Sequence, residues 1–381
     1  MGRILYVARS VGIYGASRMT MHYAIALRRA GHDVTIAYGS ASEGGPDSPL
    51  QRLRDEDIEM IEAPGFQWAF FPGGCRVIDR LARGADVVIS SHLRDIPAAM
   101  AAARRNGVRG IAMLQNLPQP GGIGAPVKRW LYRRAINRHA NLAVAVSEGV
   151  RRHVIENEGA HADRVIAIPN GIDLDAFPDP TGDERRSVRA EFGIGEDERL
   201  VVNLARINRQ KAQDVLIRAV AEMNAERRTR LTLLIAGDDD TKDGATRREY
   251  QTLADRLDVA DRFRWIGFRS DVHRLLYGCD ASVLPSRWEG LPITMLESMA
   301  ARTPIVFTEF GTRVDGIRNG ENAWQIPAED VPALARSLEE LVDTCPERLA
   351  EIGRAGRLIA EEQFSLRRGT EQFVDVVERY L

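Results

Sequence analysis

Two glutamates, Glu289 and Glu297, have the spacing in this chain that most suggests chemistry. They follow a short apolar run and belong to Pro285-Ser286-Arg287-Trp288-Glu289-Gly290-Leu291-Pro292 and the helix-like stretch after it. We expect Gly290 to free the backbone of a loop and Pro292 to occupy the first helical position, where its missing N–H costs nothing. Glu289 should then lie in the loop, beside the start of the helix.

The second glutamate is expected on a buried stripe of that helix. Glu297 shares a helical face with Ile293, Ala300 and Ala301. A carboxylate in such surroundings needs hydrogen-bond donors or must take up a proton. The hydroxyls of a polyhydroxylated ligand would supply those donors. The ordinary alternative is a surface glutamate in the loop and a helix glutamate held by a nearby arginine.

A cationic loop supplies the second set of candidate residues. Arg206, Arg209 and Lys211 follow the predicted strand 199–204 and precede a predicted helix at 212–226. The carboxyl ends of strands in a doubly wound sheet are where ligands bind. A guanidinium fork and a compact ammonium together suit the two phosphates of a nucleotide diphosphate. The alternative is a solvated basic loop.

Glycines mark a third loop, near the start of the chain. Gly12 and Gly15 lie between the first predicted strand and the first predicted helix. They let the backbone approach a ligand, and the helix start favours an anion. The pattern is not G-x-G-x-x-G, which disfavours a nicotinamide dinucleotide. No G-x-x-x-x-G-K-[ST] occurs, which argues against a phosphate-loop ATPase.

Composition sets the broad class of the protein. The 381 residues, 44% of them hydrophobic, are enough for two domains with separate cores. A net charge of -2 gives no general basic field for nucleic acid. Cys75, Cys279 and Cys345 show neither metal-ligand spacing nor a disulfide framework, which fits a reducing compartment. With no signal peptide expected and no apolar run near the required ~20 residues, we expect a cytoplasmic protein whose membrane contact, if any, is peripheral.

Strand-like apolar runs alternate with helical periodicity along the whole chain. The predicted strands are 3–8, 33–38, 58–62, 86–90, 110–114, 142–146 and 165–168, then 199–204, 231–236, 263–266, 281–284, 304–307 and 323–326. Helical patterns such as 18–30, which Gly31 should end, separate most of them, and tight-hairpin signals are absent. This alternation predicts parallel sheets covered on both faces. We therefore predict an α/β protein with two doubly wound, Rossmann-like domains that face each other across a cleft.

The domain limits follow from composition shifts. We assign residues 1–172 to a first domain and 173–198, rich in proline and charge, to a linker. Residues 199–365 would form the second domain. Residues 366–381 would form an amphipathic helix that packs back on the first domain.

Taken in this order and spacing, the loops resemble glycosyltransferase family 4. These are retaining sugar-nucleotide transferases with two Rossmann-like domains in the GT-B arrangement. The strongest part is Glu289-x7-Glu297 within the stretch 285–304, and Ala205-Arg206 with Lys211, Val146-Ser147-Glu148 and Ile168-Pro169-Asn170-Gly171-Ile172-Asp173 add to it. The resemblance covers nearly the whole chain.

The resemblance implies that residues 1–172 form the acceptor-side domain and 199–365 the nucleotide-sugar-binding domain, and it implies a role for each loop. Arg206 and Lys211 would hold the donor diphosphate and stabilise its leaving charge. Glu297 would accept hydrogen bonds from ribose, and Glu289 would contact the donor sugar. The remaining donor-binding groups would be the backbone around Gly290, Leu291 and Pro292, the loop at Gly15, and Gly267-Phe268-Arg269 near the base.

The resemblance also implies what is bound. The donor would be UDP- or GDP-linked, with no cofactor and no metal. No Asp-x-Asp motif of the metal-using type is present, and we interpret Asp238-Asp239-Asp240 as a solvated turn. We do not assign Glu289 as a nucleophile, a role that paired carboxylates take in glycoside hydrolases.

The chain departs from the family pattern at several positions. Tyr14-Gly15 stands where two glycines are frequent, and Ser17 where a glutamate is frequent. Gln115-Asn116 replaces a frequent histidine after the fifth strand. His92, after the predicted strand 86–90, either stands near the sugar as a catalytic residue or is structural.

Two aromatic segments raise the question of the acceptor. The run from Lys128 to His139 predicts a basic, aromatic helix that could rest on anionic lipid and present a lipid-linked acceptor. The alternative, which we favour slightly, is a helix whose apolar side packs on the sheet while its arginines face water. The apolar loop from Phe66 to Gly74 could line an acceptor pocket or touch a membrane.

We therefore predict a metal-independent, retaining glycosyltransferase that moves a sugar from a nucleotide diphosphate to a hydroxyl acceptor. The acceptor could be a glycan, a lipid-linked molecule or a small molecule, and no nucleic-acid partner is expected. One alternative is a sugar-nucleotide epimerase or hydrolase of the same architecture. Another is a non-catalytic nucleotide-sugar-binding protein.

Overall fold

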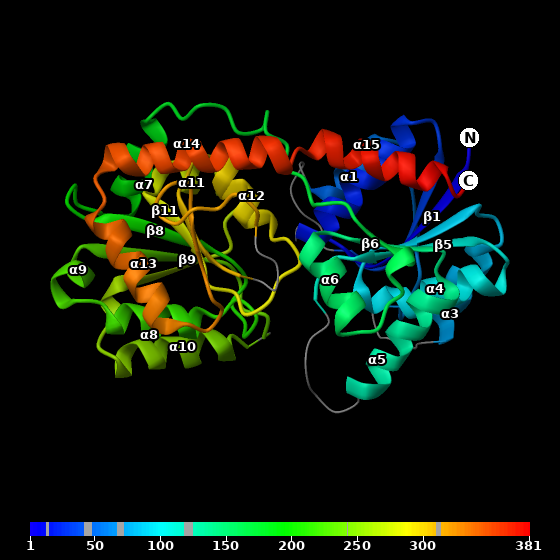
Figure 1. Cartoon of the computed structure of the whole chain (residues 1–381), viewed down its shortest axis with the longest axis horizontal. Coiled ribbons are helices and arrows are strands. Elements are labelled where there is room, and N and C mark those ends of the chain that lie inside the picture. The colour runs from blue at the N-terminus through cyan, green and yellow to red at the C-terminus, as the bar shows by residue number, and fades with distance from the viewer. Residues whose placement is uncertain (13–14, 42–47, 67–71, 118–124, 242, 310–313) are drawn as a thin grey trace. The chain divides into compact units, whose positions relative to one another are not determined.

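The chain forms two compact units, Met1–Gly171 with Leu366–Leu381, and Ile172–Ser365. The computed structural model describes residues 1–12, 15–41, 48–66, 72–117, 125–241, 243–309 and 314–381. Each unit is a parallel sheet with helices on both of its faces (Figure 1). The predicted class, an α/β protein of two doubly wound domains, is confirmed.

The first unit contains a seven-stranded sheet in the order β3-β2-β1-β4-β5-β6-β7. Neighbouring strands are parallel throughout. The strands are β1 Arg3–Val11, β2 Asp33–Ala41, β3 Glu59–Glu62, β4 Val87–Ser90, β5 Arg109–Leu114, β6 Leu142–Ala145 and β7 Val165–Ala167. All seven predicted strands of this half are present within a few residues of their expected limits. Strands β4 and β6 are buried on both faces, as continuous apolar runs require.

Helices cover both faces of this sheet. Helices α1, α2 and α15 lie on one face, and α3, α4 and α5 lie on the other (Figure 1). The helices are α1 Gly15–Arg29, α2 Pro49–Asp55, α3 Pro72–Ala82, α4 Ile96–Arg105, α5 Ala125–Arg134, α6 Glu148–Glu156 and α15 Leu366–Glu378. Short helical turns occur at Leu93–Asp95, Ala135–His139 and Ala162–Arg164. Gly31, in the left-handed region at φ 90°, follows the end of α1 as expected.

The last helix of the chain belongs to the first unit. The ring of Phe373 on α15 stacks on that of Tyr23 on α1, with centroids 4.2 Å apart, and both side chains are buried. At the end of α15, Glu378 Oε1 lies 3.1 Å from His32 Nε2. The amphipathic face of α15 therefore completes the core beside α1.

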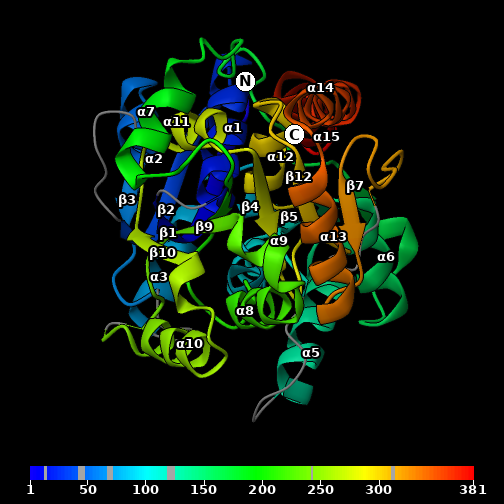
Figure 2. The same cartoon turned by 90° about the vertical axis from the view of Figure 1, so that its left-hand side faces the viewer.

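The second unit repeats this plan with six parallel strands in the order β10-β9-β8-β11-β12-β13. Its strands are β8 Arg199–Leu204, β9 Leu231–Ala236, β10 Phe263–Gly267, β11 Ala281–Leu284, β12 Ile305–Thr308 and β13 Trp324–Ile326. Its helices are α7 Asp183–Phe192, α8 Gln213–Glu222, α9 Ala225–Thr229, α10 Ala245–Arg256, α11 Val272–Gly278, α12 Ile293–Ala300, α13 Val331–Asp343 and α14 Pro346–Gln363, with a short turn at Ala260–Arg262. Helices α8, α10 and α13 cover one face, and α7, α11, α12 and α14 the other (Figures 1 and 2).

Three local predictions in this unit were wrong. Residues 173–198, which we predicted to be a linker, contain α7 and belong to the second unit. In that unit the buried Arg189 is paired with Asp280. The helix expected at 212–226 stops at Glu222, because Asn224 caps a separate helix, α9. Pro292 is the N-cap of α12 rather than its first helical residue.

In both sheets the strand order reverses at an equivalent place, beside the first strand of the unit. Strand β8 has β9 on one side and β11 on the other, and β1 lies likewise between β2 and β4. Loops that leave neighbouring strands in opposite directions open a crevice at the carboxyl ends of those strands. The loops after β8 and β11 are therefore the ones placed to hold a ligand in the second unit.

Candidate active site

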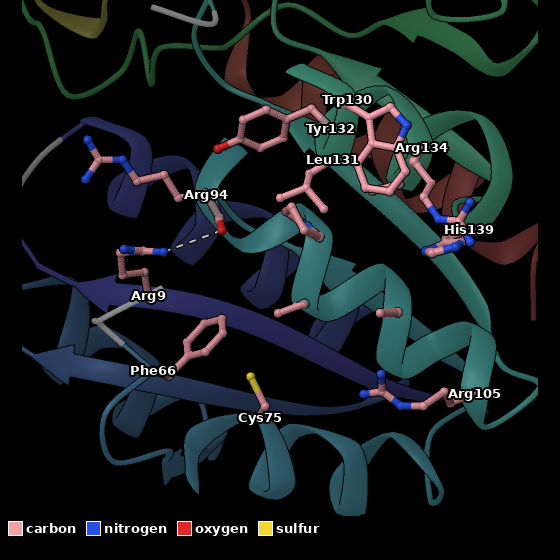
Figure 3. A pocket seen from close by; sticks show the side chains of 14 residues that line it. Arg9, Phe66, Cys75, Arg94, Arg105, Trp130, Leu131, Tyr132, Arg134 and His139 are labelled. Atoms are coloured by element: carbon pink, nitrogen blue, oxygen red, sulfur yellow. Dashed lines mark hydrogen bonds between the residues drawn. The ribbon is translucent and has the colours of Figure 1, made fainter. Parts of the chain in front are cut away.

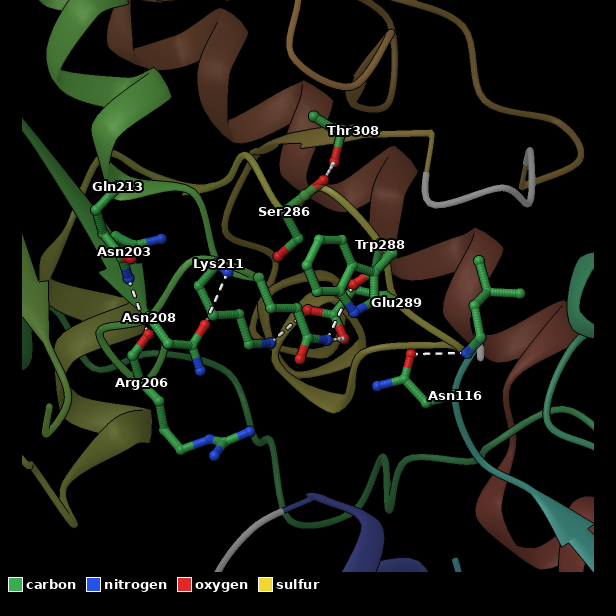
Figure 4. A network of polar contacts seen from close by, with 12 residues as sticks. Asn116, Asn203, Arg206, Asn208, Lys211, Gln213, Ser286, Trp288, Glu289 and Thr308 are labelled. Atoms are coloured by element: carbon green, nitrogen blue, oxygen red, sulfur yellow. Dashed lines mark hydrogen bonds and ion pairs between the residues drawn. The ribbon is translucent and has the colours of Figure 1, made fainter. Parts of the chain in front are cut away.

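An ion pair joins the two loops at the switch point of the second sheet. Lys211 Nζ, after β8, lies 2.5 Å from Glu289 Oε1, after β11. The other carboxylate oxygen of Glu289 accepts a hydrogen bond of 3.1 Å from Gln210 Nε2. Glu289 is only 6% exposed. The cationic loop and the acidic loop that the sequence predicted separately thus meet side by side (Figure 4).

The cationic loop is held in shape by its own amide groups. Gln213, fully buried at the start of α8, donates to Asn203 Oδ1 at 3.1 Å and to the backbone oxygen of Arg206 at 3.0 Å. Ala212 adopts the left-handed region at φ 56° to turn the chain into that helix. Asn208 Oδ1 accepts from the backbone N–H of Lys211 at 3.0 Å. The loop therefore returns onto the end of β8 and presents Lys211 in a defined direction.

Arg287, in the acidic loop, links that loop to the cationic loop and to the start of α8. Its guanidinium donates to both oxygens of Asp214, at 2.9 and 2.8 Å, and to the backbone oxygen of Arg209 at 2.8 Å. It also pairs with Glu329 at 2.7 Å. The hydrogen bonds that Arg287 donates to Asp214 raise the pKa of Arg287. Burial opposes ionisation of Asp214, yet bonds from Arg287 and Arg218 hold the pKa of that carboxyl below its usual value.

Arg206 has an acidic partner that the sequence interpretation missed. Its guanidinium bonds both carboxylate oxygens of Asp240, at 2.8 and 2.9 Å. Asn208 Nδ2 reaches the same carboxylate at 2.6 Å. Asp240 is exposed, as the interpretation of residues 238–240 as a solvated turn predicted, but its pairing with Arg206 was not foreseen. This residue orients Arg206 at the carboxyl edge of the sheet.

Glu297 lies where the helical pattern placed it. It is 3% exposed on α12, beside the equally buried Ala300 and Ala301. Before it, Gly290, Leu291 and Pro292 are buried as the chain enters the helix. The first amides of α12 point away from the helix body and carry its positive dipole end. A carboxylate on the helix and the positive end of the helix dipole thus occupy the same loop–helix unit.

The predicted base-binding segment lies at the end of β10. Gly267 takes φ 70°, and its carbonyl oxygen accepts from the backbone N–H of Gly237 at 2.8 Å. Phe268 is half exposed, as a stacking surface would be. Arg269 is engaged by Asp271 and Glu191. A side chain at Gly237 would come within 2.0 Å of the backbone oxygen of Ala205, so only glycine lets the ends of β8 and β9 approach this closely.

Three further candidates lie in the first unit, at the carboxyl edge of its sheet. Gly15 is the first residue of α1, and Tyr14 lies outside the described residues. His92 Nδ1 lies 3.4 Å from a carboxylate oxygen of Asp95, a fully buried residue. The side-chain amide of Gln115, after β5, is buried with no hydrogen-bond partner among the described residues.

The structure gathers Lys211, Glu289 and Arg206 in one loop pair, and their assigned roles remain predictions. Gln210, Asp240 and Arg287 were missed: Gln210 directly precedes Lys211 and Arg287 lies two positions before Glu289, whereas Asp240 is 34 positions from Arg206. In the described part of the chain, no group of three or more His, Cys, Asp or Glu could hold a metal ion. Within the same residues, no helix has the length and apolar character that a membrane crossing requires.

Comparison with known proteins agrees with this architecture. The family pattern "Glycosyl transferases group 1" matches residues 184–358, and "Glycosyltransferase Family 4" matches residues 13–176. EpsD of Bacillus subtilis (strain 168) is named as a glycosyltransferase. It is 31% identical to this chain over a match that covers 68% of this chain and 67% of EpsD. The D-inositol 3-phosphate glycosyltransferase of Streptomyces scabiei is 30% identical over 62% of this chain, a match that spans 53% of that protein.

The solved structures extend the likeness to the whole fold. Anabaena HepE, crystallised in complex with UDP-glucose, superposes with a TM-score of 0.86 over 100% of both chains at 18% identity. At an identity this low, the similarity is evidence for the fold alone. From the two matched families, the EpsD relationship and the doubly wound units, the chain belongs to the family 4 glycosyltransferases of GT-B fold and is a transferase enzyme.

Proposed function

We propose that this glycosyltransferase moves a sugar from a UDP-linked donor to a hydroxyl acceptor, with retention of the anomeric configuration and without a metal ion. The observation that carries the proposal is the Lys211–Glu289 pair, 2.5 Å apart at the switch point of the second sheet. It sets a cation, a buried carboxylate and the amino end of α12 within one loop pair. A GDP-linked donor remains the alternative, and the UDP-glucose bound to HepE favours UDP.

The cations suit the charge that develops during transfer. When the bond between the anomeric carbon and the donor oxygen breaks, its electron pair stays on the diphosphate. Lys211 Nζ, which lies beside Glu289, and the guanidinium of Arg206, which is held by Asp240, would stabilise that charge. The amino end of α12 adds partial positive charge. These groups would do what a metal ion does in metal-dependent transferases.

The proposed step conserves configuration by attack on the face that the leaving group departs from. The acceptor oxygen bonds to the anomeric carbon, and the acceptor proton passes to a diphosphate oxygen. Glu289 is unsuited to act as a nucleophile, because Lys211 and Gln210 engage its two oxygens. Its place beside Lys211 suits contact with sugar hydroxyls, while Glu297 would accept hydrogen bonds from ribose.

Calorimetry with UDP, GDP and ADP tests the donor class. We expect UDP to bind at least about tenfold more tightly than ADP, and Lys211→Ala to weaken UDP binding. Asp243→Asn, an exposed change in the same unit, serves as the control. Equal binding of all three nucleotides, or none, would contradict the assignment.

Product analysis tests the mechanism. NMR of the product bond should show the anomeric configuration of the donor, and addition of EDTA should leave turnover unchanged. An inverted product would overturn retention, and a loss of turnover that Mg²⁺ restores would overturn metal independence. Fast donor loss without acceptor would favour the epimerase or hydrolase alternative. Donor binding without any turnover would favour a sensor.

A further inference from the structure

An apolar cavity of about 600 Å³ lies in the first unit, between α3, α4 and α5. Figure 3 shows it bounded by α4, with Cys75 on one side and Leu131 on the other. It exists because α4 carries small residues on its outward face, including Ala98 and Ala101. Its volume is in the range of pockets that bind small molecules.

Both aromatic segments that the sequence analysis left unexplained contribute to this cavity. Phe66, buried, begins the first segment, and residues 67–71 of that segment lie outside the described residues. Trp130, Leu131 and Tyr132 come from α5, in the second segment. From the sequence we slightly favoured a helix whose apolar side packs on the sheet. That prediction was wrong for Trp130 of α5, which is 55% exposed.

The charged residues that line the cavity are all basic among the described ones. Arg9 and Arg94 lie at one end, and Arg105, Arg134 and His139 lie at the other (Figure 3). Asp95 pairs with Arg9, and Asp79 with Arg105, from outside the lining. The lining is therefore apolar in the middle and cationic at its ends.

At the other end of the cavity Arg105 is paired with Asp79, but His139 Nδ1 is buried without a hydrogen-bond partner among the described residues. Burial, and then the charges of Arg104, Arg134, Arg105 and Arg138, lower the pKa of His139. Arg134 stacks over the ring of Trp130, 5.6 Å from its centroid. A negatively charged group placed here would relieve repulsion among several cations at once.

Helix α5, which lines the cavity with Trp130, also carries exposed apolar side chains. Val127 is 61% exposed, one turn before Trp130 on α5. Arg133, Arg134 and Arg138 follow on the same helical segment and are exposed. Exposed aromatic and aliphatic residues beside arginines are typical of surfaces that lie in the headgroup region of a membrane.

We propose that this cavity binds an anionic membrane lipid. Its apolar chain would lie along Ala98 and Ala101, and its phosphate would be held by Arg105, Arg134 and His139. A free phosphate would satisfy the cations but leave the apolar wall exposed to water, and a neutral lipid would bring no negative charge to Arg134 and His139. Lipid binding in the first unit would not depend on which donor the second unit binds.

The thiol of Cys75 offers a direct measure of occupancy. Cys75 lines the cavity and is partly exposed, whereas Cys279 is buried and Cys345 is exposed. In a Cys345→Ser background, dioctanoyl phosphatidic acid should slow maleimide labelling of Cys75 at least about fivefold. Dioctanoylglycerol should protect far less, and inorganic phosphate should not protect. Equal protection by the neutral lipid, or none by phosphatidic acid, would overturn the proposal.

Vesicle co-sedimentation tests the membrane as the source of the lipid. Binding to phosphatidylcholine vesicles that contain phosphatidylglycerol should exceed binding to phosphatidylcholine alone. Ala101→Phe fills the cavity and should weaken binding, as should Arg134→Gln, by about fivefold for one lost arginine. Matched controls in the second unit, Ala245→Phe and Arg354→Gln, should have no effect.

Two results would refute the inference even if vesicles bind. Unchanged binding by Ala101→Phe, with its melting temperature preserved, would show that the cavity is not used. Equal losses in the variants and their matched controls would show a non-specific surface effect. UDP binding by each variant should stay normal, which separates failure of this proposal from failure of the proposed function.

Discussion

At the scale of single residues, Lys211 is the group on which the proposed chemistry most depends. Only three lysines occur in the chain, and this one is held beside a buried carboxylate. Its ammonium is a compact charge that can turn from Glu289 toward a phosphate oxygen. Arg206, fixed by Asp240, is less free to turn.

Lys211→Ala should lower turnover by more than about tenfold, because the leaving diphosphate loses its nearest cation. Steady-state kinetics with saturating donor would measure the loss. Arg209→Gln is the matched control, since Arg209 is an exposed cation of the same loop. Turnover unchanged by Lys211→Ala would remove this lysine from the mechanism.

At the scale of elements, the site depends on how the loops after β8 and β11 are joined. The Arg287–Asp214 pair is nearly buried, at 13% and 14% side-chain exposure. Arg287 also binds the backbone of the cationic loop. Two loops that come from distant parts of the sequence are thereby fixed as one unit.

Arg287→Gln should lower the free energy of unfolding by about 2–4 kcal/mol, because Asp214 would stay largely buried without its main partner. Chemical denaturation would measure the loss. Asp214→Asn combined with Arg287→Gln should cost less than the sum of the single changes. Arg218→Gln, which removes the more exposed partner of Asp214, should cost less than about 1 kcal/mol. Additive costs in the double variant would contradict direct coupling.

The loop after β10 should make stability depend on pH. Hydrogen bonding from Arg269 lowers the pKa of Asp271 to about 2. A depressed pKa stabilises the fold above the unfolded value, near 4, and the gain is lost as pH falls from about 4 to 2. Asp271 is about one third exposed, so we expect about 1–2 kcal/mol after solvent screening. Asp271→Asn should flatten the pH dependence of unfolding in that window, and an unchanged slope would refute the assignment.

At the scale of the whole molecule, two compact units share one chain, and the last helix belongs to the first of them. The core of the first unit therefore includes residues from both ends of the sequence. Phe373 against Tyr23 is the centre of that packing. The second unit has its own continuous core around β8, β9 and α13.

Phe373→Ala should destabilise the first unit by about 3–5 kcal/mol, through lost burial and the cavity left behind. Hydrogen exchange should speed up for amides of α1 and β1 and stay unchanged for β8 and β9. Leu338→Ala, in the core of the second unit, should give the opposite pattern. Equal acceleration in both units would contradict their independence.

Local patterns in the sequence were enough to predict the elements and the class of the molecule. The strands alternate with helices, and continuous apolar runs such as 281–284 admit few other interpretations. Gly290 and Pro292 marked the loop that carries Glu289 and the start of the helix that carries Glu297. The motif therefore indicated the family before any contact was known. Element ends were less certain, because Asn224 could equally continue a helix or cap the next one.

Contacts between distant residues were decided only by the tertiary structure. Lys211 is 78 positions from Glu289, and Arg206 is 34 from Asp240, so no local pattern connects either pair. Strand order brings them together, because β8 and β11 become neighbours only when the sheet forms. The cavity beside α4 has the same origin. Small residues on one helix leave a hollow only when α3 and α5 pack on either side of it.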